Sequence, residues 1–130
     1  MKRNSYLLLV LMMMLAMASC EGQSGAKKLS VNEFEKKLTE TPGKIILDVR
    51  TPNEYNSGHL PDAMLINVND KDFKSKIEQL DKSKPVFVYC KAGYRSSNAS
   101  AILLQSGFKE VYDLQGGIDS WSGAKKTVVR

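Results

Sequence analysis

The stretch KPVFVYCKAGYRSS, residues 84–97, contains the strongest strand signal in the chain and, directly after it, a cysteine. Residues 86–89 are β-branched and aromatic, which is typical of a buried strand, and the proline stands only at the start. Four residues separate Cys90 from Arg95, and an apolar helical pattern then runs over 96–106. The stretch therefore predicts a strand, a tight loop and a helix, with Cys90 at the carboxyl end of the strand.

Apolar runs and amphipathic segments alternate on both sides of this stretch. Capping boxes at Ser30–Glu33 and Thr51–Glu54 mark the starts of two helices, and Pro52 suits the first turn of the second. The expected strands are 44–49, 64–68, 84–89 and 111–114, and the expected helices are 31–40, 52–58, 72–80, 96–106 and 118–121. This order predicts a three-layer α/β domain, in which a small, mainly parallel sheet of about five strands carries helices on both faces. Ligands bind beyond the carboxyl ends of strands in such sheets, which is where Cys90 is expected.

Composition limits the classes of function. With 130 residues, 42% hydrophobic and 25% charged, the chain suits one globular domain that needs neither disulfides nor metal for its core. The net charge of +5 falls to +3 without Lys2 and Arg3, and no basic stripe with aromatics points to nucleic acid. A mild positive charge favours small anionic substrates. One histidine and one free cysteine cannot supply the usual three or four ligands, so neither a metal nor a cofactor is expected.

Residues 1–19 have the form of a secretory signal peptide, with a basic start and an unbroken apolar run over 6–18. This run of 13 residues is shorter than the roughly 20 that a helix needs to cross a bilayer, which disfavours a retained transmembrane anchor. Small residues stand directly before Cys20 and resemble a bacterial lipobox, although Met17 stands where leucine is usual. The resemblance implies cleavage before Cys20 and acylation of its sulfur. A plain signal peptide with a coincidental cysteine is the alternative.

Composition divides residues 20–130 into three parts. Residues 20–28 are rich in Gly, Ser and Gln and are predicted to form a flexible tether, followed by the domain over 29–125 and a tail over 126–130. The expected location is the bacterial cell envelope, with the protein held at a membrane surface by lipid on Cys20. Cys90 is then the only free thiol, so the mature chain can form no intramolecular disulfide. A lone thiol in an oxidising compartment indicates a reactive role or an intermolecular partner, and a buried inert cysteine is the alternative.

The loop after Cys90 suits a reactive thiolate. Backbone amides of a tight loop before a helix make a concave anion site, and a thiolate there ionises more readily than a free cysteine. Gly93 supplies backbone freedom, and Arg95 or Lys91 could hold a doubly charged substrate such as thiosulfate. The predicted site consists of Cys90 and the loop residues Lys91, Ala92, Gly93, Tyr94 and Arg95, with Asp48, Arg50 and Ser96 in support.

Four ordered motifs resemble those of the rhodanese family and cover nearly the whole mature domain. They are DVR with EY over 48–55, GHLPDA over 58–63, CKAGYR over 90–95 and LQGGIDSW over 114–121. The resemblance implies a thiosulfate sulfurtransferase (rhodanese) in which the Cys90 thiolate takes a sulfane sulfur from thiosulfate or a persulfide and passes it to cyanide or a thiol. For Asp48, Arg50 and the only histidine, His59, we expect structural roles.

Two other functions remain open. One is a sulfur-carrier or partner-binding module of the same fold with little free turnover. The other is a cysteine-dependent phosphatase, because related phosphatases carry a cysteine and an arginine around a similar loop. Those enzymes place five residues between the two, whereas only four stand between Cys90 and Arg95, which suits the smaller sulfur transfer.

Overall fold

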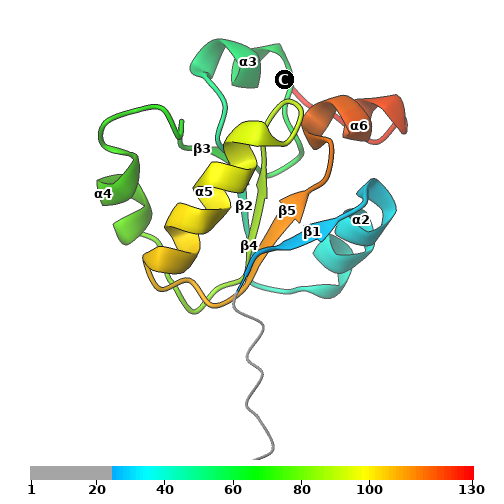
Figure 1. Ribbon diagram of the computed structural model, residues 1–130. Helices are drawn as coiled ribbons and strands as arrows, with labels where there is room; N and C mark the ends of the chain where they lie inside the picture. The colour runs from blue at the N-terminus through cyan, green and yellow to red at the C-terminus, as the bar shows by residue number, and fades with distance from the viewer. Residues whose placement is uncertain (1–24) are drawn as a thin grey trace, which may run out of the picture.

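A five-stranded parallel sheet forms the centre of the molecule (Figure 1), in the order β1-β5-β4-β2-β3. The structure is a computed structural model that describes residues 25–130, so the predicted signal peptide and Cys20 lie outside the described residues. The strands are β1 (Lys27–Leu29), β2 (Ile45–Asp48), β3 (Met64–Leu65), β4 (Val86–Tyr89) and β5 (Val111–Leu114). The helices are α2 (Val31–Glu40), α3 (Pro52–Ser57), α4 (Phe73–Glu78), α5 (Tyr94–Gln105) and α6 (Gly117–Gly123). No helix in this part of the chain has the length and apolar character that a bilayer crossing requires.

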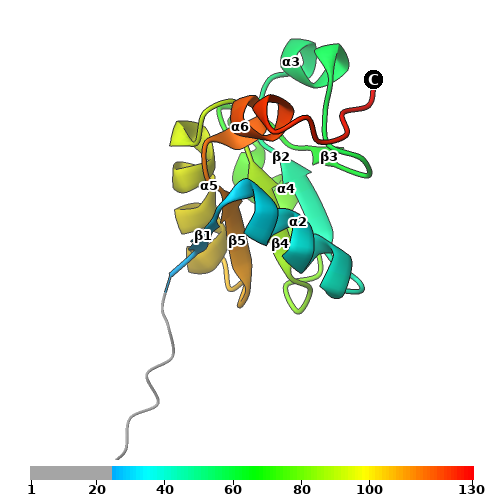
Figure 2. The ribbon, with the colours of Figure 1, turned by 90° about the vertical axis from the view of Figure 1, so that its right-hand side faces the viewer.

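Helices cover both faces of the sheet, with α4 and α5 on one side and α2 and α6 on the other (Figure 2). Side chains alternate along β4, so Val86, Val88 and Cys90 pack under α5 while Phe87 and Tyr89 face the opposite layer. Burial of both strand faces is the reason that β4 is apolar without a polar alternation. The predicted α/β architecture is confirmed.

The ends of the domain differ from the expectation. Lys27 and Lys28, which the composition assigned to a flexible tether, form β1 with Leu29 and pair with β5. The sequence KKL carries no strand signal. Its strand conformation comes from pairing with the neighbouring strand, β5. The expected second strand, 64–68, shortens to β3, and α5 begins at Tyr94, two residues before the expected start.

Residues 126–130, predicted as a tail, pack against the domain. His59 and Val129 exchange two backbone hydrogen bonds of 2.9 Å, and Trp121 Nε1 donates to the carbonyl of Thr127. The His59 ring stacks on Tyr55 at 3.8 Å between centroids, and its Nδ1 lies 3.0 Å from the Tyr55 carbonyl oxygen. These contacts hold the segment after α3, in agreement with a structural role for His59.

Candidate active site

Cys90 follows the last residue of β4, and its side chain is 1% exposed. Two groups of the following segment contact its sulfur. The Gly93 N–H donates to Sγ at 3.1 Å, and the thiol donates to Ser96 Oγ at 3.5 Å. Ser96 is itself fully buried and donates to the Gly93 carbonyl at 3.2 Å. The loop therefore curls around the sulfur, and the predicted supporting residue Ser96 lies against it.

Helix α6 determines which way the peptide groups of the loop face. The N–H groups of Ile118 and Asp119 donate to the carbonyls of Cys90 and Lys91 at 2.9 and 3.1 Å. These carbonyls are held by α6, and the loop N–H groups are left to face the other way. The loop ends in a left-handed turn at Gly93, where φ is +110°.

Gly117 allows this close approach of two backbones. Its φ is +59°, and a Cβ at this position would lie only 2.5 Å from the Cys90 carbonyl oxygen. A side chain here would push α6 away from the loop. The second glycine of the LQGGIDSW motif thus allows α6 to pack directly on the segment that carries the cysteine.

Both cations of the loop are paired with carboxylates from other elements. Arg95 donates to the two carboxylate oxygens of Glu54 through Nη1 and Nη2, each at 2.8 Å, and Lys91 Nζ lies 2.7 Å from Asp119 Oδ2. The hydrogen bond from Arg95 is the main reason that the pKa of Glu54 falls to about 2, with further lowering by Thr51. The same pairing raises the pKa of Arg95.

This pairing changes the expected picture of the loop. The sequence indicated Arg95 and Lys91 as the residues that hold a substrate, and it assigned Glu54 to the cap of α3 and to the EY pair of a family motif. Glu54 does cap α3, because it accepts from the Thr51 N–H at 3.1 Å, and it also orients Arg95. Of the other loop residues, Ala92 is exposed and Tyr94 is 88% exposed, so both lie at the rim.

Asp48 and Arg50 form a separate, closed network. Asp48 is fully buried and accepts from the Arg50 guanidinium at 2.6 Å and from the Tyr89 hydroxyl at 2.6 Å. Arg50 also donates to the Gly58 carbonyl, and Tyr89 accepts from the Leu60 N–H. Burial, followed by the contact with Asp48, raises the pKa of Tyr89. No hydrogen bond within the described chain joins Asp48 or Arg50 to the loop side chains, in agreement with a structural role.

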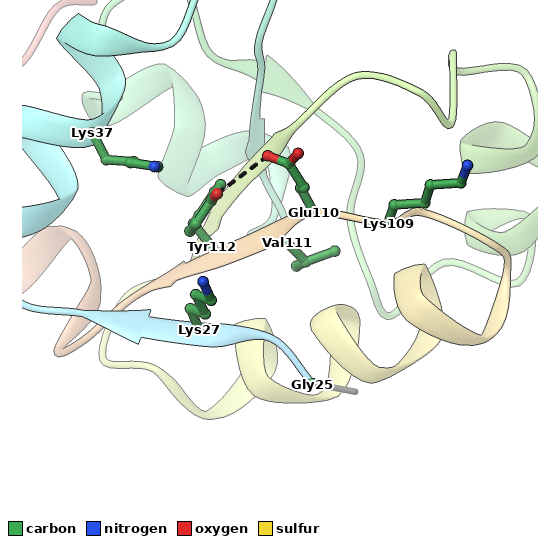
Figure 3. A pocket seen from close by; sticks show the side chains of 7 residues that line it. All are labelled: Gly25, Lys27, Lys37, Lys109, Glu110, Val111 and Tyr112. Carbon is green, nitrogen blue, oxygen red and sulfur yellow. Dashed lines mark hydrogen bonds between the residues drawn. The ribbon is translucent and has the colours of Figure 1, made fainter. Parts of the chain in front are cut away.

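Several cavities lie along β5, among them a smaller one that adjoins the loop and a larger one that does not. The smaller, of about 210 Å³, is lined by Ala92, Gly93 and Tyr94 together with residues of β1, β5 and α5. The larger, of about 510 Å³, is lined by Lys27, Tyr112 and other residues (Figure 3) that include no member of the loop. Within residues 25–130, no group of three His, Cys, Asp or Glu side chains could hold a metal ion.

Fold and loop together define a class of protein: α/β domains in which one cysteine follows a central parallel strand and is wrapped by a short amide-rich loop. The model of the Rhodanese-like domain family matches residues 30–124. The chain belongs to the rhodanese-like family.

Individual relatives agree on the domain and differ in their named activities. The chain is 38% identical over 101 residues to the thiosulfate sulfurtransferase GlpE of Shewanella oneidensis, which covers 78% of this chain and 97% of the relative. It is 41% identical over 95 residues to a tRNA uridine(34) hydroxylase of Cytophaga hutchinsonii, and this match covers 71% of the chain and only 30% of that longer protein. The crystal structure of a rhodanese-related protein from Thermoplasma volcanium matches with a TM-score of 0.69 at 28% identity, covering 79% of this chain and 97% of the other.

Proposed function

We propose that the protein is a sulfurtransferase that carries a sulfane sulfur on Cys90 as a persulfide. Thiosulfate or a persulfide serves as donor, and cyanide or a thiol serves as acceptor. The observation that carries this proposal is the wrapping of Sγ by its own loop, with the Gly93 N–H at 3.1 Å from the sulfur. The similarity to a thiosulfate sulfurtransferase over almost its full length supports the same chemistry.

In the first step, the Cys90 thiolate attacks the outer sulfur of thiosulfate. A sulfur–sulfur bond forms at Sγ, the sulfur–sulfur bond of thiosulfate breaks, and sulfite leaves with the bonding electron pair. No proton has to move, so a general base is not needed once the thiol is ionised. Hydrogen-bond donors around the sulfur, such as the Gly93 N–H, stabilise both the thiolate and the anionic outer sulfur of the persulfide.

In the second step, an acceptor attacks the outer sulfur and the Cys90 thiolate leaves. Cyanide gives thiocyanate, and a thiolate gives a new persulfide, so the enzyme returns to its starting state. The role of Arg95 in both steps is to place positive charge beside the loop. Because Glu54 holds two of its nitrogens, Arg95 acts from a fixed position.

Mass spectrometry and turnover test this proposal with the two cysteines as matched variants. The purified protein incubated with thiosulfate should gain the mass of one sulfur atom on Cys90, and thiocyanate should form when cyanide is added. Cys90→Ser should lose both signals, whereas Cys20→Ser should keep both, because these are the two cysteines in the chain. Transfer that persists in Cys90→Ser would refute the assignment.

A second function is favoured by one observation, the 1% exposure of the Cys90 side chain. A thiol so enclosed suits a sulfur carrier that loads only when a partner protein engages the rim of the loop. Such a carrier should show little persulfide with thiosulfate alone and should gain it in the presence of a loaded donor protein. Rapid turnover with thiosulfate and cyanide would exclude this alternative.

We further propose that lipid on Cys20 holds the domain in the bacterial cell envelope. Support comes from the apolar run and small residues before Cys20 and from the direction of β1, which enters the sheet at the end opposite to Cys90 (Figure 1). An anchor attached upstream of β1 would join the domain at the end of the sheet opposite to the loop. Intact mass of detergent-extracted protein should show cleavage before Cys20 and attached acyl chains, both absent in Cys20→Ser.

A further inference from the structure

The cavity of about 210 Å³ beside the loop has an incompletely bonded carboxylate in its wall. Asp113 lies in β5 and is only 2% exposed. Its Oδ2 accepts a long hydrogen bond of 3.4 Å from the Ser97 hydroxyl, and its Oδ1 has no partner among residues 25–130. A buried carboxylate normally has several donors, so Asp113 retains unused capacity to accept hydrogen bonds. Burial also raises the pKa of Asp113, against the opposing effect of the Ser96 and Ser97 hydroxyls.

A lysine stands opposite Asp113 on the same face of the sheet. Lys28 is the register partner of Asp113 in the parallel β1–β5 pair, and it lines the same cavity. Its side chain is exposed, and its positive charge opposes the rise in the pKa of Asp113. The preceding residue, Lys27, points to the other face and lines the larger cavity near Tyr112 (Figure 3), as alternation along a strand requires. The smaller cavity thus has a carboxylate in its interior and an ammonium group at its rim.

These charges select a class of ligand. A simple anion would be repelled by Asp113, and a metal ion would need more ligand atoms than one carboxylate provides, since no group of three His, Cys, Asp or Glu occurs within residues 25–130. An organic ammonium group, in contrast, can donate to the carboxylate of Asp113, which lines the cavity. Oδ1 is itself buried, so the ligand reaches this oxygen only if the cavity wall moves. A carboxylate on the same ligand would then meet Lys28. The cavity of about 210 Å³ has room for a molecule of amino-acid size.

We propose that this cavity binds a small zwitterion of the free amino acid class, with its ammonium group on Asp113 and its carboxylate on Lys28. The site is distinct from the sulfur of Cys90 and does not depend on the proposed sulfur transfer. It shares Ala92, Gly93 and Tyr94 with the loop around that sulfur. A bound zwitterion therefore contacts the loop directly, so its binding and the loading of Cys90 affect each other reciprocally.

The test is an NMR titration of the full chain with three probes. L-serine carries both charges, ethanolamine carries only the ammonium group and acetate carries only the carboxylate. We expect saturable shifts of the backbone amides of Ala92, Gly93, Tyr94 and Gly116 with L-serine, weaker binding of ethanolamine and none of acetate. Acetate binding as tightly as L-serine, or no saturable shift with L-serine, would overturn the proposal.

Three variants connect the shifts to the two charges. Asp113→Asn keeps the shape of the side chain and should weaken L-serine binding about 10-fold or more, because an ammonium–carboxylate bond is among the stronger hydrogen bonds. Lys28→Gln should weaken it about 2- to 5-fold, because the lysine is exposed. Lys27→Gln removes the same charge from the other face and should leave binding unchanged. Since Lys28 and Lys27 are exposed, their replacement tests the site even if Asp113→Asn alters folding; equal effects of the two lysine variants would contradict the proposed site.

Discussion

Asp48 and Asp113 are two buried aspartates on strands of one sheet, and they differ in how their charge is compensated. Asp48 is 0% exposed and accepts from Arg50 and Tyr89, so both of its oxygens are bonded. Asp113 is 2% exposed, yet one oxygen has no partner within residues 25–130 and the other has a single long contact. Two equally buried carboxylates can therefore have different roles. A carboxylate whose partners all come from the chain stabilises the fold, whereas one with spare acceptor capacity beside a cavity can serve a ligand.

The largest loss of stability is expected from breaking the closed network of Asp48, Arg50 and Tyr89. Asp48→Ala leaves the guanidinium of Arg50 buried without its carboxylate, and loss of one member of a buried pair costs about 3–5 kcal/mol of the free energy of unfolding. Chemical denaturation should show this loss. The matched control is Asp81→Ala, whose carboxylate is exposed and bonded to Ser83, and it should change stability far less than Asp48→Ala does.

Asp48→Ala also tests whether Asp48 supports only the fold or takes part in sulfur transfer. At a temperature where Asp48→Ala is folded, persulfide formation on Cys90 should remain within a few-fold of the wild-type rate. A stable Asp48→Ala protein that fails to load sulfur would mean that Asp48 acts in the active site and not only in the fold.

Local features of the fold were predictable from sequence because the relevant partners are close along the chain. Ser30 and Glu33 form the expected capping box, and so do Thr51 and Glu54. Residues 86–89 form a central strand because their side chains suit burial on both faces. The placement of Cys90 at the strand end followed from the order of strand, loop and helix. In each case, the interaction that decides the structure spans a few residues.

Contacts between distant segments were not predictable in this way. The pairing of β1 with β5 joins Lys28 to Asp113, and neither residue carries a pattern that reveals the other. Arg95 and Glu54 are 41 positions apart, and Lys91 and Asp119 are 28 apart. The sequence therefore identified the loop residues but not the carboxylates that hold two of them. Such pairs arise from packing of α3 and α6 near the loop, which one sequence alone does not encode in its periodicity.

An intermediate effect is expected at the partly buried pair of Glu54 and Arg95. The pKa of Glu54 is about 2, against an ordinary value near 4.5. The unfolded chain therefore binds more protons than the folded chain between these pH values. The stabilisation is present above about pH 4.5 and is lost as the pH falls towards 2. Glu54→Gln should lower the free energy of unfolding at pH 7 by about 1 kcal/mol and should flatten its decrease on acidification.

The control for this pair is Glu40→Gln, because Glu40 forms only an exposed, 4.0 Å contact with Lys36. Denaturation of both variants between pH 3 and pH 7 would show the difference. An acid profile of Glu54→Gln identical to that of the wild type would mean that the pair with Arg95 contributes nothing to the fold.

The smallest change in stability, and one of opposite sign, is expected at Asp113. Because burial raises its pKa, the folded chain binds more protons than the unfolded chain between the ordinary value of 3.8 and the raised one. Ionised Asp113 therefore destabilises the protein, and this penalty develops as the pH rises through that window. Asp113→Asn has no charge to bury, so at pH 7 its stability should equal or exceed that of the wild type by up to about 1 kcal/mol. Saturating L-serine should reverse the order, since a ligand that binds the folded wild type about 10-fold more tightly than Asp113→Asn raises the melting temperature of the wild type by more. If Asp113→Asn instead lost several kcal/mol without ligand, Asp113 would belong with Asp48 among the groups that hold the fold, and the contrast between the two aspartates would disappear.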